Sequence, residues 1–220
     1  MTAKTDALQR AKDMAYVETF RCPAGALCLD FCNTGEGARG HRHVEWISDF
    51  GDLVDWLEAA AAVPASLAVR LRKAGVKSSP AAAHAWARAI RFREALFRVL
   101  DRRAAGGVAP SEDLAAIEAE YFSAVVFARL TWAESRFAWI LDGKASTLDS
   151  VMQPLVESAL SLLTSERLAR LRRCGNSTCH WLFIDDTKNH SRRWCEMASC
   201  GNVNKVRRHR ERARITSQTR

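Results

Sequence analysis

The sequence lacks the features that would place the chain in a membrane or send it out of the cell. No run of about 18 apolar residues occurs among its 220 residues, so no membrane-spanning helix is expected. The opening segment, MTAKTDALQRAKDM, is polar and has no apolar core of the kind that a secretory signal needs. These absences predict a cytoplasmic protein with no membrane partner.

The sequence also lacks the common catalytic motifs. It contains no nucleophile elbow, no P-loop, no dinucleotide-binding glycine motif and no HExxH pair. We therefore expect a protein that is not an enzyme, and we keep an uncharacterised enzyme as an alternative.

Most of the chain carries no excess of positive charge. The excess of basic over acidic residues lies at the C-terminal end. The chain has 33 Lys and Arg against 25 Asp and Glu, a net charge of +8. Residues 168–220 hold 13 of the basic and four of the acidic residues, so residues 1–167 are nearly neutral. Such a cluster of cations favours nucleic acid or another polyanion as partner.

Hydrophobic periodicity predicts a fold that is mainly α, with a minor α+β contribution. Helices are expected to start at residue 48 or 49, at 64, at 79, at 111 (running to about 130) and at 147. The segment GALCLDFCNT, residues 25–34, alternates leucine and phenylalanine with cysteine and aspartate and predicts a strand. Residues 35–43 are expected to form a loop and residues 131–143 a hairpin. The seven tryptophans are mostly expected in the core.

Four of the seven cysteines form a pattern typical of a metal site. Cys174, Cys179, Cys195 and Cys200 make two C-x4-C pairs separated by fifteen residues. Zinc binds four thiolates in a tetrahedron with sulfur at about 2.3 Å, and a hairpin between the pairs would bring them together. We predict one structural Zn²⁺ ion on these four residues, with His180 and His190 as weaker candidates.

The connection between the two pairs predicts that hairpin. Trp181 and Phe183 alternate on one strand, residues 185–189 form a turn that supplies carboxylates to Arg192 or Arg193, and residues 192–194 return as the second strand. A module of this size has few apolar groups to bury, so the metal is expected to supply much of its folding energy. Chelation should then unfold the module and leave the helical domain intact.

The segment after Cys200 reads GNVNKVRRHRERAR and predicts a basic helix over residues 203–214. Asn202 is expected to cap it, and Val206 and Ala213 to contact the metal core. Nucleic acid is the expected partner, with phosphate contacts more readily expected than base readout. The candidate nucleic-acid-binding residues are Arg192, Arg193, Lys205, Arg207, Arg208, Arg210, Arg212 and Arg214.

Arg93 falls in the middle of the apolar stripe of the helix that starts at residue 79. A buried guanidinium needs carboxylate or carbonyl partners, so we predict a pair with Asp30, or otherwise with Glu94 or carbonyls near Asn33. The pair is either a structural ion pair or part of an effector pocket in which Asp30, Asn33, Thr34 and Arg93 orient a small molecule.

The remaining metal-ligating side chains do not form a convincing second site. Cys22, Cys28 and Cys32 are expected to pack in the core, because their spacing on a strand suits no tetrahedron. His41 and His43 are expected to be exposed in a loop.

The C-terminal segment resembles the CGNR zinc-finger family. The matching elements are Cys174, Cys179, the segment WLFIDDTKNHSRRWCEM, the sequence SCGN and Lys205 with its basic helix. The family signature ends in arginine where this chain has Val203, which removes one cation but none of the thiolates.

The preceding part resembles the ABATE domain, the stress-induced transcription regulator domain of the same proteins. The segments LCLDFCNT and RFREAL, residues 27–34 and 91–96, carry this resemblance. It implies a zinc-dependent, DNA-binding transcription regulator whose helical domain senses a small-molecule effector or forms a homodimer. An RNA-binding or ribosome-associated zinc protein, or an enzyme with a structural zinc, is the alternative.

These expectations divide the chain into four parts. Residues 1–19 form a polar lead-in and residues 20–167 a helical domain with a short strand and a hairpin. Residues 168–214 form the zinc module, a β-hairpin followed by a basic helix, and residues 215–220 a tail.

Overall fold

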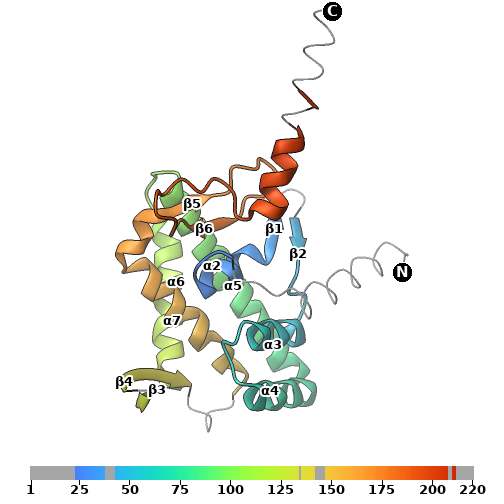
Figure 1. The fold of residues 1–220 in the computed structure, drawn as a ribbon. Coiled ribbons are helices and arrows are strands. Elements are labelled where there is room, and N and C mark those ends of the chain that lie inside the picture. Colours follow the sequence, from blue (N-terminus) through green and yellow to red (C-terminus); the bar gives the residue numbers. More distant parts are fainter. Residues whose placement is uncertain (1–22, 38–42, 134, 142–146, 208–209, 212–220) are drawn as a thin grey trace, which may run out of the picture.

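The computed structural model describes residues 23–37, 43–133, 135–141, 147–207 and 210–211, and they form mainly helices. The mainly α fold expected from the sequence is thereby confirmed (Figure 1). No helix in these ranges is both long enough and apolar enough to cross a membrane. The helices are α2 (Leu27–Asn33), α3 (Phe50–Ala59), α4 (Ala65–Lys77), α5 (Ser79–Ala104), α6 (Ser111–Ala124) and α7 (Met152–Leu163).

Three two-stranded antiparallel sheets accompany the helices in the described part of the chain. They are β1 (Gly35–Gly37) with β2 (His43–Glu45), β3 (Ala128–Ala133) with β4 (Arg136–Leu141), and β5 (Leu171–Arg173) with β6 (Leu182–Ile184). The β3–β4 pair confirms the hairpin expected near residues 131–143.

The prediction of a strand over residues 25–34 is wrong, because residues 27–33 of this segment form helix α2. Every residue from Cys28 to Asn33 is buried, and α2 packs against both α5 and α7. A short segment that is buried on all sides needs no hydrophobic periodicity. The alternation of residue types in this segment therefore does not distinguish a strand from a helix. Helix α2 lies near the centre of the fold in Figure 1.

Three further expectations are corrected. Residues 35–37 and 43–45 pair as strands where a loop was expected, and residues 38–42 between them lie outside the described ranges. Helix α6 ends at Ala124 rather than near residue 130, because the chain turns there into β3. Trp132 and Trp139 are on the exposed β3–β4 hairpin and not in the core.

One hydrophobic core joins the helices to the cysteine-rich end. It contains side chains of α2, α3, α5 and α7 together with Leu171, Leu182, Phe183 and Ile184 from β5 and β6. Ile184 N donates to Ala24 O at 2.8 Å, which ties β6 to the residues just before α2. The strands of the C-terminal module therefore share the core of the helical part.

Candidate metal centre and basic surface

The four predicted cysteines come together. One sulfur from each of Cys174, Cys179, Cys195 and Cys200 lies within 4.8 Å of the other three. The Sγ atoms of Cys179 and Cys195 are 3.6 Å apart. A tetrahedron with zinc–sulfur bonds of about 2.3 Å has edges of about 3.8 Å, so the spacing fits a metal ion of that kind.

Backbone turns hold the cysteines in place. Cys174 follows directly after β5, and its N–H donates to Trp181 O at 2.8 Å. Cys179 N donates to Asn176 O at 3.0 Å, which closes a tight turn before the second sulfur. Two N–H groups point at sulfur: Cys195 N lies 3.4 Å from Cys174 Sγ, and Asn176 Nδ2 lies 3.5 Å from Cys200 Sγ. Such donors stabilise thiolates bound to a metal.

Gly175 allows the two halves of the site to approach closely. Its N–H donates to Arg193 O at 2.8 Å, and a Cβ atom at this position would lie 3.0 Å from that same oxygen. Any side chain there would push apart the strand end that carries Cys174 and the segment that leads to Cys195.

The protonation of the cluster shows why it needs a cation. Hydrogen bonds from the thiols of Cys179 and Cys195 lower the pKa of Cys174 to about 2. The hydrogen bonds that Cys179 and Cys195 make to Cys174, together with burial, raise the pKa of both thiols well above the usual range. Without a metal, Cys179 and Cys195 therefore keep their protons at neutral pH, and metal binding must release them.

The prediction that the strand around Phe183 pairs with residues 192–194 is wrong. β6 pairs with β5, in the register Leu171 with Ile184 and Arg173 with Leu182, and residues 192–194 are not a strand. Leu171, which precedes the first cysteine, is buried beside β6. The short strand upstream of the cysteines, β5, therefore provides the pairing that was expected from residues 192–194 downstream of the turn.

Arg192, predicted as a nucleic-acid contact, makes structural contacts within the chain. Its guanidinium lies 4.4 Å from the centroid of the Phe183 ring. Its Nε donates to Trp194 O at 3.0 Å and its Nη2 to Pro23 O at 3.0 Å, with a further bond to Cys195 O. All of these donors are used to hold the segment around Cys195 against the core.

The two aspartates of the turn have separate tasks. Asp185 is fully buried and accepts from the N–H and hydroxyl of Thr187 and from Arg192 N. Burial opposes its ionisation, but these hydrogen bonds hold its pKa below the usual value. Asp186 binds Arg167 and Arg170 instead of the predicted Arg192 or Arg193.

The basic helix begins earlier than expected. Residues Met197–Gly201 form a π-helical turn, and residues 202–207 and 210–211 continue as helix, so Asn202 is not its N-terminal cap. Asn204 is buried and donates to Cys200 O at 2.9 Å, whereas Val206 is 49% exposed. The helix is therefore attached through Asn204, and not through the predicted Val206. Ala213, the second predicted contact, lies outside the described ranges.

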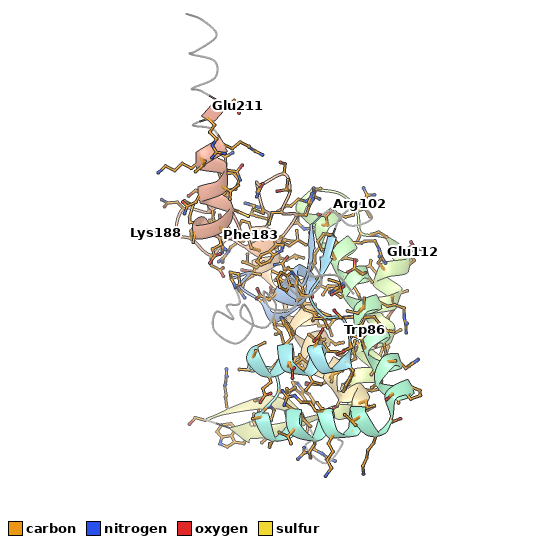
Figure 2. The ribbon with its side chains drawn as sticks, turned by 90° about the vertical axis from the view of Figure 1, so that its right-hand side faces the viewer. Trp86, Arg102, Glu112, Phe183, Lys188 and Glu211 are labelled. Atoms are coloured by element: carbon orange, nitrogen blue, oxygen red, sulfur yellow. The ribbon has the colours of Figure 1, made fainter. Side chains whose placement is uncertain are left out.

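Cations project from this helix and from the neighbouring turn. Arg193, Lys205, Arg207 and Arg210 are exposed, and Arg207 also donates to Asn204 Oδ1 at 2.9 Å. Figure 2 shows the helix rising away from Phe183, with Glu211 at its outer end. Val203 is 59% exposed, so the missing arginine removes a cation from this surface and no buried contact. The predicted residues Arg208, Arg212 and Arg214 lie outside the described ranges.

Arg93 is buried as predicted, but its main partner is Glu45. Its Nη1 and Nη2 donate to the two carboxylate oxygens of Glu45 at 2.7 and 2.5 Å. Nη1 also donates to Thr34 Oγ1 at 3.0 Å, and Nε to Glu94 Oε1 at 2.9 Å. The predicted pair with Asp30 is wrong, since Asp30 Oδ1 accepts from Ala24 N at 3.1 Å, and the alternative partner Glu94 is confirmed.

Glu45 was missed because it follows a loop-like segment and has no distinguishing spacing. A buried guanidinium needs a carboxylate partner, and this requirement was the only indication of such a residue. Asn33, the fourth residue of the predicted effector pocket, bonds to Leu182 through both ends of its amide. Arg93 and Thr34 are therefore bonded to each other, whereas the side chain of Asn33 is bonded to the backbone of Leu182.

The other cysteines of the described part are core residues. Cys28 and Cys32 are buried on α2, and burial raises the pKa of Cys28 to about 11. No second group of three or more metal-ligating side chains lies together in the described ranges. Neither His180 nor His190 joins the four cysteines. Cys22 and His41 lie outside these ranges, as does the side chain of His43.

Comparison with known families assigns both parts of the chain. Residues 25–166 match the family model ABATE, described as "putative stress-induced transcription regulator". Residues 170–213 match the model of the CGNR zinc finger. No curated protein matches the chain.

Proposed function

The chain belongs to the ABATE family and carries a CGNR zinc finger, and from this premise we propose that it is a zinc-dependent transcription regulator that binds DNA through the finger. In this proposal Zn²⁺ is held by Cys174, Cys179, Cys195 and Cys200 and has a structural role. When bound, the ion supplies the positive charge that lets four neighbouring thiols ionise together.

The observation that supports DNA binding is the attachment of the basic helix to the metal site. The helix continues directly from Cys200, and Asn204 bonds back to the carbonyl of that cysteine. The cations of Lys205, Arg207 and Arg210 are consequently displayed in fixed positions, with Arg193 exposed on the neighbouring segment. A surface of this kind binds phosphates, and its arginines can also bind base edges.

The proposal assigns no chemical reaction to the protein. Four protein thiolates complete a tetrahedral zinc site and leave no position for a substrate or an activated water molecule. In this proposal the helical part serves in sensing or assembly.

The test is selection of binding sequences by the zinc-loaded full chain from a random duplex pool. We expect one enriched sequence, bound with a steep salt dependence. The triple variant K205Q/R207Q/R210Q should weaken binding and reduce the salt slope by about three, one for each lost phosphate contact. The matched control, K73Q/K77Q/R91Q, removes the same charge from exposed positions of α4 and α5 and should bind like the unmodified protein.

Two outcomes would contradict the proposal. Absence of any enriched duplex would leave general polyanion binding and no specific regulation. Tighter binding to structured RNA than to the selected duplex would favour the RNA-binding alternative, for which the same charges would serve.

A further inference from the structure

The β3–β4 hairpin has an apolar face that is exposed to solvent. Leu130 is opposite Trp139 and Trp132 opposite Phe137 in the antiparallel register, so the four side chains share one face. They are 57%, 53%, 63% and 69% exposed, in that order. The rings of Trp132 and Phe137 pack edge to face with their centroids 4.9 Å apart.

The apolar surface continues from the hairpin onto the helical body. A cavity of about 340 Å³ lies where Trp139 of β4 faces Tyr121 of α6 and Val156 and Leu160 of α7. Phe122, near the end of α6, and Val126, just after it, are also more than 60% exposed. We define the hairpin surface as the exposed side chains of Phe122, Val126, Leu130, Trp132, Phe137 and Trp139.

This surface is as large as the largest apolar patches that single chains expose. Its four aromatic side chains are each more than half exposed. Since an aromatic side chain presents about 150–250 Å², these rings alone expose on the order of 400 Å². The largest apolar patch of a typical monomer is about 300–600 Å², and such patches mark interaction sites. Leu130 and Val126 bring the exposed apolar area to about 600 Å², so two copies would bury about 1,200 Å², the lower limit of a standard interface.

We propose that the hairpin surface is the interface of a twofold homodimer, formed with a second copy of this chain. Two such surfaces reach the lower end of the area that a specific interface buries, and closed twofold pairing is the commonest way in which soluble chains associate. In face-to-face packing of two antiparallel hairpins, the aromatic tip of each copy lies over the cavity beside Trp139 of the other. Each cavity is then closed by an aromatic side chain.

The distribution of charge on the hairpin agrees with this arrangement. Arg129 pairs with Ile140 and Arg136 with Ala133, so both arginines are on the opposite face. Face-to-face packing therefore does not bring these like charges together. The hairpin also lies at the end of the fold opposite the C-terminal helix (Figure 1), so dimerisation leaves the basic surface uncovered.

Sedimentation equilibrium of the zinc-loaded full chain tests the proposal without any nucleic acid, so its result is independent of the proposed DNA binding. We expect a reversible dimer. The variant W132S/F137S should weaken it roughly 100-fold or more, because central aromatic side chains dominate interface affinity. The matched control is V76S/V108S, which removes two apolar side chains that are 82% and 90% exposed elsewhere. It should dimerise like the unmodified chain.

A second measurement uses the unmodified protein and does not depend on how a variant folds. Amide hydrogen exchange of residues 128–133 and 135–141 should slow as the protein concentration rises through the dimer dissociation constant. A chain that stays monomeric to about 100 μM, or a W132S/F137S variant that is folded and dimerises normally, would overturn the proposal. Binding of a monomeric chain to phosphatidylcholine vesicles would assign the surface to a membrane instead and would also overturn it.

Discussion

The side chain of Asn33 and the backbone of Leu182 exchange two hydrogen bonds. Asn33 Nδ2 donates to Leu182 O at 2.9 Å, and Leu182 N donates to Asn33 Oδ1 at 3.0 Å. Both groups are buried, so the amide of a residue on α2 takes the place of a neighbouring strand beside β6. This contact joins the ABATE part of the chain to its zinc finger.

Replacement of Asn33 by alanine should destabilise the whole chain. It leaves the buried N–H and C=O of Leu182 without partners, which costs about 2–4 kcal/mol in the free energy of unfolding. Urea denaturation of the zinc-loaded protein measures this change. The control N189A alters an exposed asparagine of the turn and should change the stability by less than about 0.5 kcal/mol. An equal, small effect of both variants would show that the Asn33 contact is not structural.

Removal of the metal should loosen only part of the zinc finger. Residues 174–180 and 193–207 depend on the cysteines, whereas β6 is bonded to Asn33, Ala24 and β5. We therefore expect hydrogen exchange to accelerate in the first two segments after chelation, while residues 182–184 stay protected. Added Zn²⁺ should restore the protection. Loss of protection in β6 as well would support the separate, metal-dependent module that the sequence predicts.

The variant R93M should lower the free energy of unfolding by about 3 kcal/mol. It removes the cation from between Glu45 and Glu94 and leaves two carboxylates close together in a largely buried site. Both carboxylates keep some contact with water, which limits the cost. The triple variant R93M/E45Q/E94Q should regain part of the lost stability in guanidinium denaturation. A loss below about 1 kcal/mol for R93M would mean that this ion pair does not hold β2 to α5.

Arg192 and Arg193 should behave differently although they are neighbours in the sequence. Arg192 fixes the backbone around Cys195, so R192Q should weaken zinc retention roughly tenfold, as changes around metal ligands commonly do. Arg193 is exposed, and R193Q should keep zinc normally and only weaken polyanion binding. Competition with a chromophoric chelator gives the zinc affinity of both variants. Equal zinc affinities would contradict the structural role of Arg192.

The sequence predicts the metal ligands because their spacing is a local constraint. Two pairs of closely spaced cysteines, joined by a segment that turns back on itself, are enough to bring four sulfurs together. This holds whichever strand pairs with β6. The partner of β6 depends on tertiary packing, so residues 192–194 were an equally reasonable choice by pattern. Leu171 pairs with Ile184 because both contribute to the shared core, and nothing in the spacing of the cysteines reveals that core.

Helix α2 and the ion pair of Arg93 show the same limit. Burial of Arg93 follows from its place in an apolar stripe, and the need for a carboxylate follows from its charge. The identity of that carboxylate depends on where β2 runs, which no periodicity describes. Helix α2 is buried on all sides, so its sequence does not distinguish helix from strand.

The most direct test of the account is the affinity of the full chain for duplex DNA with and without zinc. Fluorescence anisotropy with the selected duplex would compare zinc-loaded, chelated and zinc-restored protein at about 50 and 200 mM salt. We predict tight, salt-sensitive binding by the zinc-loaded chain, a loss of at least about tenfold after chelation, and full recovery with Zn²⁺. Equal affinity of the zinc-loaded and metal-free protein would contradict the claim that the four-cysteine site organises the DNA-binding surface.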